Sequence, residues 1–257
     1  MEYLTAEGIA VPHCFTTRLG GVSTGHLSSM NIGAHRGDAP ENVEENLRIL
    51  GTAVGFSLED LVATKQTHSD IVRRVGRGDR GGYMVEGASA ECDALITNES
   101  GVGLTVFTAD CTPILLYDPV TGAVGAAHAG WRGTAKGIAA RTVEAMAKEF
   151  GCQPQNICAA IGPNIGPCCF ETDADVPDAM VHAFGDGAYA HIRQENGKHY
   201  VNLKELNALC LRNAGVRHIE ISPLCTACRQ DLFWSHRRVG QMRGSQGAII
   251  ICKGGSV

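Results

Sequence analysis

Apolar residues recur at spacings near four in one segment close to the N-terminus. A helix would place these residues on a single face: Val43, Leu47, Leu50 and Val54. The preceding stretch, Asp38-Ala39-Pro40-Glu41, puts proline just inside a helix start and an acid in the first turn. The pattern predicts a helix that begins near Pro40.

Shorter apolar runs without helical spacing dominate the middle of the chain. They predict strands at 70–75, 93–97, 102–107, 114–117 and 123–128. The last two runs are separated by Asp118-Pro119-Val120-Thr121-Gly122, which has turn residues at both ends. These two strands are therefore expected to form a hairpin.

The second half of the chain alternates helical and strand patterns. A helix is expected from about 134 to 150, with Thr134 as N-cap and Gly151 just past its end. Further strands are predicted at 157–161, 217–221 and 248–252, and helices at 173–184 and 203–213. Hairpins and crossovers together predict an α/β fold, a layered sandwich of mixed β-sheets flanked by helices. With no low-complexity linker, residues 1–257 are expected to form one domain.

Composition and charge narrow the class of protein. The chain is 44% hydrophobic and 19% charged, with a formal net charge of −5, so nothing favours nucleic acid or an anionic membrane as partner. The N-terminus, Met1-Glu2-Tyr3-Leu4-Thr5, lacks a basic segment followed by an apolar one, and no apolar stretch is long enough to span a bilayer. We therefore expect a cytoplasmic protein, either monomer or homodimer.

The chain has eleven cysteines, an odd number that argues against a fully paired disulfide framework. Cys225 and Cys228 form a CxxC motif, but no second CxxC completes a four-cysteine site, so free thiols are expected there. The adjacent Cys168 and Cys169 are poorly suited to bonding each other and are expected to be two independent side chains.

Three reactive side chains occur where predicted strands meet loops: His68, Cys111 and His128. Strand ends hold functional groups on a rigid scaffold. Zinc binds thiolate and imidazole, and a catalytic zinc takes three protein ligands and keeps one open position. The spacing matches no short zinc-finger pattern, and an inert buried cysteine with two hydrogen-bonded histidines is the alternative.

Two loops could bind a polar ligand. After His128, Gly130 and Gly133 allow close backbone approach and Arg132 could contact an anion, although glycines that only serve the turn are equally compatible. The N-terminal stretches 15–23 and 29–33 combine arginine, glycine, serine and asparagine, which suits either a loop over a polar ligand or a plain surface turn.

Five segments, taken in order, resemble one family over nearly the whole chain. They are Phe15-Thr-Thr-Arg-Leu-Gly-Gly-Val-Ser23 with Ser29-Met-Asn-Ile-Gly33, Gln66-Thr67-His68, Ala109-Asp-Cys-Thr-Pro113, His128-Ala-Gly-Trp-Arg-Gly133 and Phe233-Trp-Ser-His-Arg-Arg238. The family is YfiH/YlmD, also described as laccase-domain proteins, purine nucleoside phosphorylases or peptidoglycan editing factors. The chain departs from it with Gln-Thr-His-Ser in place of the common Gln-Val-His-Gly, and with His236 where tyrosine is frequent.

The resemblance implies a fold related to the toxin-type cysteine-hydrolase fold, and a metal, zinc with copper as the alternative, held by His68, Cys111 and His128. It implies phosphorolysis of adenosine, inosine, guanosine and methylthioadenosine, with nucleoside and phosphate as small-molecule partners, and deamination of adenosine. The other reported activities are copper-dependent polyphenol oxidation and editing of a peptidoglycan precursor. This chain has no HxH pair of the kind that multicopper sites use, which disfavours the oxidase.

Residue roles follow as hypotheses. Guanidinium groups bind phosphate in a bidentate manner, which makes Arg18, Arg132 and Arg237 candidate substrate contacts; Asn31 and Gln66 are added from the family motifs. Cys111 is either a metal ligand or, in a metal-free hydrolase, a nucleophile paired with His128. Asp110 could orient a histidine or accept a proton, or it could simply tie down its turn.

Overall fold

The computed structural model describes residues 2–34, 36–85, 87 and 90–255. A five-stranded sheet has the order β1-β2-β14-β6-β3. Its strands are β1 (Tyr3–Leu4), β2 (His13–Thr16), β14 (Gln246–Ile251), β6 (Gly103–Thr108) and β3 (Leu61–Ala63). Only the pair β3–β6 in this sheet is parallel.

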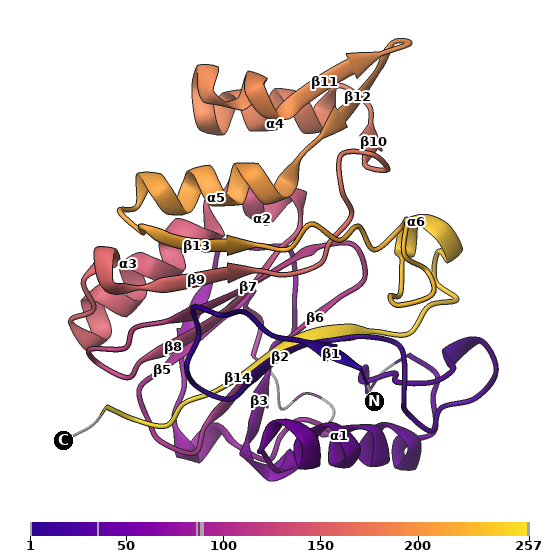
Figure 1. The fold of residues 1–257 in the computed structure, drawn as a ribbon, viewed down its shortest axis with the longest axis vertical. Coiled ribbons are helices and arrows are strands. Elements are labelled where there is room, and N and C mark those ends of the chain that lie inside the picture. Colours follow the sequence, from indigo (N-terminus) through magenta and orange to yellow (C-terminus); the bar gives the residue numbers. More distant parts are fainter. Residues whose placement is uncertain (1, 35, 86, 88–89, 256–257) are drawn as a thin grey trace.

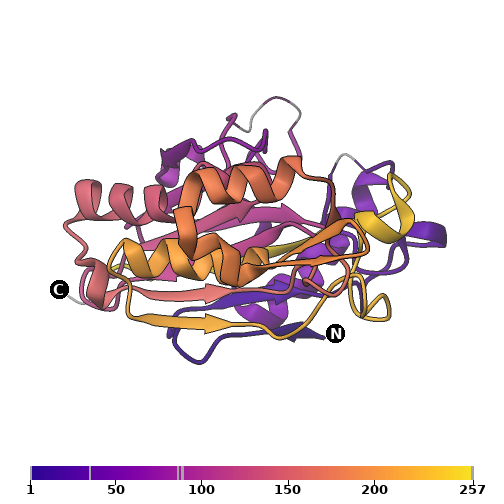
Figure 2. The same ribbon diagram turned by 90° about the horizontal axis from the view of Figure 1, so that it is seen from above.

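A six-stranded sheet has the order β13-β9-β7-β8-β5-β4. Its strands are β13 (His218–Ile221), β9 (Cys158–Ile161), β7 (Thr112–Tyr117), β8 (Val124–Ala129), β5 (Ala94–Thr97) and β4 (Val72–Arg74). Parallel pairs lie at both edges, β13–β9 and β4–β5, around an antiparallel centre. Both large sheets are therefore mixed (Figures 1 and 2).

The two sheets pack face to face because successive side chains in a strand point to opposite faces. In β7, Leu115 lies in the core between the sheets, whereas Ile114 and Leu116 face the helices. In β14, Ile250 lies in the same inner core and Ile249 faces the opposite side. The result is a four-layer arrangement of helix, sheet, sheet and helix.

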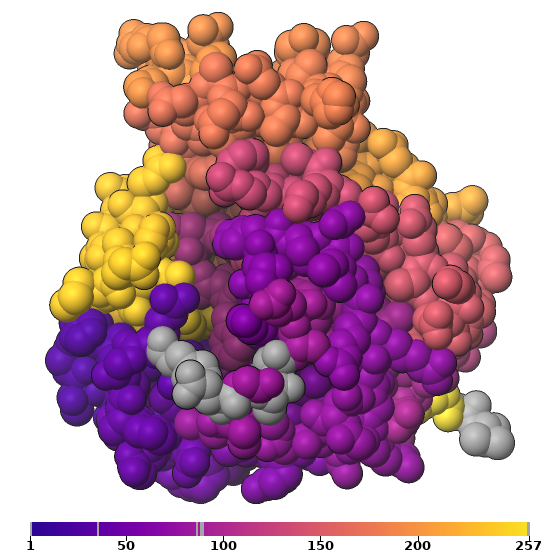
Figure 3. Space-filling view, turned by 180° about the vertical axis from the view of Figure 1, so that it is seen from behind, coloured from indigo at the N-terminus to yellow at the C-terminus, as the bar shows by residue number. Residues whose placement is uncertain are grey.

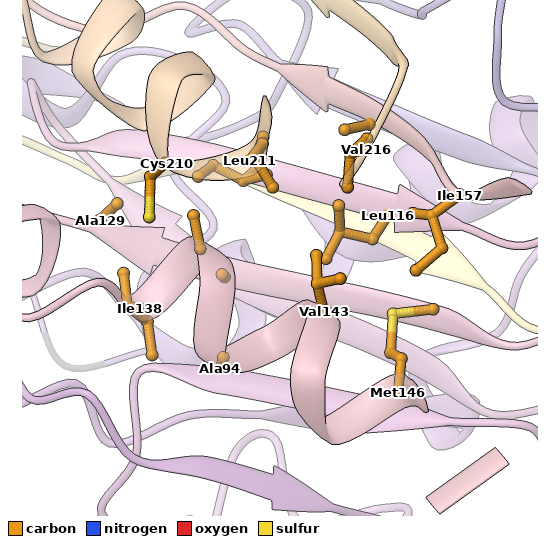
Figure 4. Packing of buried hydrophobic residues seen from close by; sticks show 14 of the residues in the cluster. Ala94, Leu116, Ala129, Ile138, Val143, Met146, Ile157, Cys210, Leu211 and Val216 are labelled. Carbon is orange, nitrogen blue, oxygen red and sulfur yellow. The ribbon is translucent and has the colours of Figure 1, made fainter. Parts of the chain in front are cut away.

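Helices close the outer faces of the sandwich. α1 (Pro40–Val54) packs on the five-stranded sheet, and α3 (Ile138–Phe150) and α5 (Leu203–Asn213) pack on the six-stranded sheet (Figure 4). A third, three-stranded sheet of β10 (Glu171–Thr172), β12 (Lys198–Val201) and β11 (Ile192–Glu195) lies with α4 (Asp175–Phe184) at one end of the molecule (Figure 1).

Short elements complete the chain. They are α2 (Trp131–Ala135), α6 (His236–Val239) and the 3-10 helices η1 (Gly25–Leu27), η2 (Leu58–Asp60), η3 (Arg77–Asp79), η4 (Pro154–Asn156) and η5 (Gly185–His191). No helix among the residues described is both long enough and apolar enough to cross a bilayer.

The α/β class with mixed sheets flanked by helices is confirmed, and so is the helix that begins at Pro40. The hairpin is also confirmed, because β7 pairs with β8 and Asp118 Oδ1 accepts the Val120 N–H at 2.8 Å. The relation to the toxin-type cysteine hydrolases and the single domain stay predictions.

The helix expected from about 134 to 150 is confirmed over 138–150 but is wrong in its start at Thr134. α2 already starts at Trp131, and Gly137 then takes a left-handed conformation (φ 76°) that separates α2 from α3. An L side chain is strained at such a φ, so glycine is what allows the break. The predicted end is confirmed, since Gly151 (φ 71°) donates its N–H to Ala147 O.

Candidate metal centre

Three segments far apart in the sequence deliver His68, Cys111 and His128 to one place. His68 lies in the loop between β3 and β4, Cys111 in the turn between β6 and β7, and His128 near the end of β8. Each offers one ligand atom, and these atoms all lie within 4.8 Å of one another. The imidazole rings meet edge to face, with centroids 5.0 Å apart.

One buried carboxylate, Asp93, organises both histidines. It immediately precedes β5 and is 0% exposed. Its Oδ1 accepts the His68 backbone N–H at 3.1 Å and lies 2.8 Å from His128 Nδ1. Its Oδ2 accepts the backbone N–H and the hydroxyl of Ser69, both at 2.6 Å. The same carboxylate therefore shapes the His68 turn and orients the His128 ring.

The pKa values of the two histidines are shifted in opposite directions. Burial opposes the charged form of His128, but the neighbouring Cys111 and Asp93 outweigh it and raise the pKa of His128 to about 9. Burial, and then the positive charge of His128, lower the pKa of His68. Burial works against the Asp93 carboxylate too, yet hydrogen bonds from His128 and Ser69 hold its pKa well below the usual range.

The residues fit a zinc ion. His128 uses Nδ1 for Asp93 and so keeps Nε2 for a metal, which is the usual second-shell arrangement around a metal-bound histidine. His68 Nδ1 is buried and has no hydrogen-bond partner among the described residues. A Cβ at Gly130 would lie 2.5 Å from this nitrogen and 3.2 Å from Cys111 Sγ, so the glycine leaves the space between the ligands open.

Asp110 precedes Cys111 and has an unusual backbone conformation, with φ 93°. Its carboxylate accepts hydrogen bonds from Thr226 Oγ1 (2.6 Å), Ser235 Oγ (3.0 Å) and the Arg237 backbone N–H (2.6 Å). None of these partners is a histidine. The carboxylate that orients a histidine is Asp93, which the sequence pattern marked only as the start of a strand.

The side chains of Arg18 and Asn31 both make hydrogen bonds that link the N-terminal loop to neighbouring segments. Arg18 donates to the carbonyls of Ser28 and Gln230, and its guanidinium lies 3.9 Å from the Trp234 ring centroid. Asn31 is fully buried, and its amide bonds Asp38 Oδ2 at 2.9 Å and the backbone of the C-terminal segment. Their role as substrate contacts stays a prediction.

The side chains of the other three predicted substrate contacts differ in how far other residues of the protein already engage their polar groups. Gln66 pairs its amide with the backbone of Phe107, at 2.7 and 2.8 Å. Arg237 donates to the carbonyls of Cys169 and Glu171. Arg132, by contrast, is exposed, lies over the Trp131 ring and is close enough to His68 to lower its pKa.

Sequence reasoning missed two arginines: Arg243, which lies near Cys111, and Arg36, which lies near Arg243. Burial, followed by the positive charge of Arg36, lowers the pKa of Arg243 to about 10. The neighbouring Cys111 and Asp110 partly offset this shift. Arg36, Gln66 and the neighbouring Ser245 line a cavity of about 550 Å³. Figure 3 shows a hollow in the surface of the molecule seen from behind. The yellow segment around α6, the pink segment at α2 and the purple segment of residues 60–69 border it.

Cys225 and Cys228 are free thiols as expected, but Cys168 and Cys169 are not the independent side chains that the sequence predicted. Cys168, Cys169, Cys225 and Cys228 form a second group whose sulfur atoms lie within 4.8 Å of one another. The adjacent pair takes the place of the second CxxC that the sequence lacks. The hydrophobic periodicity of the sequence does not indicate that the segment with Cys168 and Cys169 meets the segment with Cys225 and Cys228.

Comparison with known proteins shows the family of this chain. The model of a family described as multi-copper polyphenol oxidoreductase laccase matches residues 12–253. The purine nucleoside phosphorylase YlmD of Geobacillus stearothermophilus is 40% identical over 240 residues, which is 91% of this chain and 86% of that protein. A purine nucleoside phosphorylase of Deinococcus radiodurans is 39% identical over 97% of this chain and 92% of its own length.

Solved structures show the same fold. The crystal structure of YlmD from Geobacillus stearothermophilus superposes with a TM-score of 0.91 at 38% identity and covers 96% of this chain and 94% of its own. A Bacillus licheniformis protein titled YfiH gives 0.90 at 36% identity, with coverage of 94% and 92%. Fold and site thus define a layered α/β protein with a His-Cys-His centre. The chain belongs to the laccase-domain family of the YfiH and YlmD proteins.

Proposed function

We propose that this chain is a cytoplasmic, zinc-dependent purine nucleoside phosphorylase that also deaminates adenosine. Adenosine, inosine, guanosine and methylthioadenosine are the proposed nucleosides, and inorganic phosphate is the second substrate. The observation that carries the proposal is the convergence of His68, Cys111 and His128, with the half-buried Arg243 near Cys111. The names of the relatives, purine nucleoside phosphorylases, support it.

Phosphorolysis exchanges one bond at the ribose for another. A phosphate oxygen bonds to C1′ while the bond from C1′ to the purine nitrogen breaks. The electron pair of that bond moves to the purine, which takes up a proton, and the products are the free base and ribose 1-phosphate. The reaction therefore requires an anion pocket and a means of stabilising charge on the departing base.

In this proposal, arginines near the centre meet the first requirement and a bound zinc ion would meet the second. Arg243 provides positive charge near Cys111, Arg36 lies close to Arg243, and the exposed Arg132 lies near His68. Guanidinium groups bind phosphate in a bidentate manner, so these side chains fit the anion. Zinc at the His-Cys-His centre would supply a Lewis acid that polarises the substrate. Asp93 keeps the two histidines oriented throughout.

The decisive experiment supplies adenosine with and without phosphate to the zinc-loaded protein. Adenine and ribose 1-phosphate should appear only with phosphate, and inosine and ammonia should appear without it. Cys111→Ala should abolish both reactions. Cys158→Ser, which changes a partly buried thiol outside both cysteine-containing clusters, is the matched control and should keep full activity. Wild-type rates from Cys111→Ala would overturn the proposal.

A second function is favoured by one observation. Cys111 lies close enough to His128 to raise the pKa of the imidazole, and His128 Nδ1 faces Asp93, which is the arrangement of a cysteine nucleophile, a base and an orienting carboxylate. In a metal-free state the centre would then be a cysteine hydrolase, for example an amidase that edits a peptidoglycan precursor. Activity that survives a chelator but not iodoacetamide would select this function over zinc-dependent phosphorolysis.

Copper-dependent oxidation gains no such support. The only two groups of metal-type ligands found among the described residues are the His-Cys-His centre and the four cysteines. Multicopper oxidation relies on several histidine-rich copper sites. We therefore do not propose it.

A further inference from the structure

The four clustered cysteines lie on two loops that leave the same edge of the six-stranded sheet. β9 and β13 are parallel neighbours, with Ile161 opposite Ile221, so the chain leaves both strands in the same direction. Cys168 and Cys169 follow β9, and Cys225 and Cys228 follow β13. A further bridge between Asn164 and Cys225 extends this pairing towards the cysteines.

We propose a second metal centre at this edge, a structural zinc site formed by the four thiolates of Cys168, Cys169, Cys225 and Cys228. Zinc–sulfur bonds of about 2.3 Å in a tetrahedron place the sulfur atoms about 3.8 Å apart. Cys228 Sγ lies 3.5 Å from Cys168 Sγ and 3.4 Å from Cys169 Sγ, and all four sulfur atoms lie within 4.8 Å. Metal binding would release one proton from each thiol.

The geometry favours a shared ion over a disulfide. A disulfide joins two sulfur atoms at about 2.05 Å. Here Cys228 approaches both members of the adjacent pair almost equally, and Cys225 completes the group from the buried side. One metal ion uses all four thiols, whereas a single disulfide would leave two of them unused.

Groups around the cluster suit a tetrathiolate. Four thiolates and one Zn²⁺ carry a net charge of −2. Arg238 donates to Cys169 Sγ at 3.6 Å, and the Lys204 ammonium, although its residue is 6% exposed, donates to the carbonyl of Leu224 next to Cys225. The Gly166 N–H donates to Cys225 Sγ at 3.1 Å. These two cations would offset part of the negative charge of a tetrathiolate.

The proposed site also braces one wall of the His-Cys-His centre. Thr226, inside the CxxC, donates to Asp110 Oδ1, and Asp110 precedes Cys111. On the other loop, the Cys169 carbonyl accepts from the Arg237 guanidinium, while the Arg237 backbone N–H donates to Asp110 Oδ2. Zinc at the four cysteines would therefore fix both loops that hold Asp110, which makes it a positioning site and not a catalytic one.

Metal analysis of the purified full-length protein tests the proposal without any assay of activity. Wild type should contain two zinc ions per chain, and the double variant Cys225→Ser/Cys228→Ser should contain one. Cys111→Ser should also contain one, and Cys158→Ser should keep two. A wild-type content of one zinc that is lost in Cys111→Ser would overturn the second site, and iron in place of zinc would overturn the assignment of the metal.

Alkylation mapping keeps the proposal testable if the double variant does not fold. Cys168 and Cys228 are exposed, so without a metal they should react readily with iodoacetamide. We expect both to be protected in the zinc-loaded protein and to become modified after chelation, as read by peptide mass spectrometry. Rapid modification of the zinc-loaded protein, or a disulfide-linked peptide that joins the two loops, would overturn the site. Loss of phosphorolysis alone would bear on the proposed function and not on this one.

Discussion

At the scale of single residues, the carboxylate of Asp93 makes the centre possible. It accepts three backbone N–H groups, the Ser69 hydroxyl and the His128 ring, so one side chain sets the position of two proposed ligands. Removing an outer-shell partner of this kind typically lowers metal affinity about 10–100-fold. Asp93→Asn should therefore raise by that factor the zinc concentration that half-reactivates the metal-free enzyme.

A matched control separates this effect from general destabilisation. Asp118 is also 0% exposed and accepts backbone N–H groups in a turn, but it lies at the opposite end of the β7–β8 hairpin from Cys111 and His128. Asp118→Asn should lower the free energy of unfolding without changing the zinc requirement. Equal zinc requirements in the two variants would show that Asp93 has no special role at the centre.

Arg243 carries a prediction about phosphate. Its guanidinium is half-buried near Cys111 and Arg36, and a lost hydrogen bond to a charged group costs about 1.5–3 kcal/mol. Arg243→Gln should therefore raise the KM for phosphate about 10–100-fold and leave the KM for the nucleoside nearly unchanged. Arg212→Gln alters an exposed arginine on α5 and should change neither constant. If both KM values rose together in Arg243→Gln, general damage to the cleft would explain the loss better.

At the scale of elements, the junction of β8 and α2 depends on a missing side chain. A Cβ at Gly130 would meet His68 Nδ1 at 2.5 Å and Cys111 Sγ at 3.2 Å, so Gly130→Ala must displace a proposed ligand. A displacement of about 1 Å can cost about 100-fold in rate, and we expect kcat/KM to fall by that order. Gly78→Ala places its Cβ in open space and is the control. Full activity in Gly130→Ala would mean that His68 is not needed where it lies.

The start of α1 carries a pH-dependent prediction. Burial works against the Asp38 carboxylate, but hydrogen bonds from Ser23, Asn31 and Asn42 outweigh it and lower its pKa. Because the pKa is lower in the folded than in the unfolded chain, the stabilisation is complete above about pH 3.9 and is lost as the pH falls through the folded value. Asp38→Ala should cost about 1 kcal/mol of unfolding free energy at pH 7.

Urea unfolding of both proteins across acidic pH checks this sign. The difference between wild type and Asp38→Ala should shrink as the pH falls below about 4, since the wild-type carboxylate becomes protonated. Glu41→Ala changes an exposed acid in the first turn of the same helix and should show a much smaller difference at pH 7. A difference that grows in acid would contradict the role given to Asp38.

The same elements show what sequence patterns can reveal. Local periodicity was enough for α1, for the β7–β8 hairpin and for α5, because these depend on neighbouring residues. The break at Gly137 was missed because a glycine within an apolar periodic run does not by itself end a helix. The pairing of β9 with β13 is parallel and distant in sequence, so no local pattern could bring Cys168 to Cys228.

The residues of the candidate site also divide into those that the sequence could indicate and those that it could not. His68, Cys111 and His128 could be selected because thiol and imidazole at strand ends are the ligands that zinc prefers, and the resemblance to the family decided between this interpretation and inert side chains. Asp93 and Arg243 could not be selected, because an aspartate at a strand start and an arginine beside a glycine are common. Their importance arises only from the folded arrangement, where burial and nearby charges act on them.

At the scale of the whole molecule, the centre joins the two layers of the sandwich. His68 lies on the link from β3 to β4 and Cys111 on the link from β6 to β7, and each link passes from the five-stranded to the six-stranded sheet. His128 lies on β8 of the six-stranded sheet. A metal ion held by all three would tie two crossovers to a central strand, and its binding should stabilise the fold as a whole.

Metal removal tests this link between binding and stability. A ligand at 100 times its Kd that binds only the folded state adds about 2.7 kcal/mol, so chelation should lower Tm and abolish phosphorolysis, and added zinc should restore both. In Cys111→Ser, zinc should no longer restore activity, and any zinc-dependent rise in Tm that persists should come from the four cysteines, since it should vanish when Cys225→Ser/Cys228→Ser is added. Full phosphorolysis by protein shown to be metal-free would refute zinc dependence, because the cysteine and histidine pair would then act without a metal.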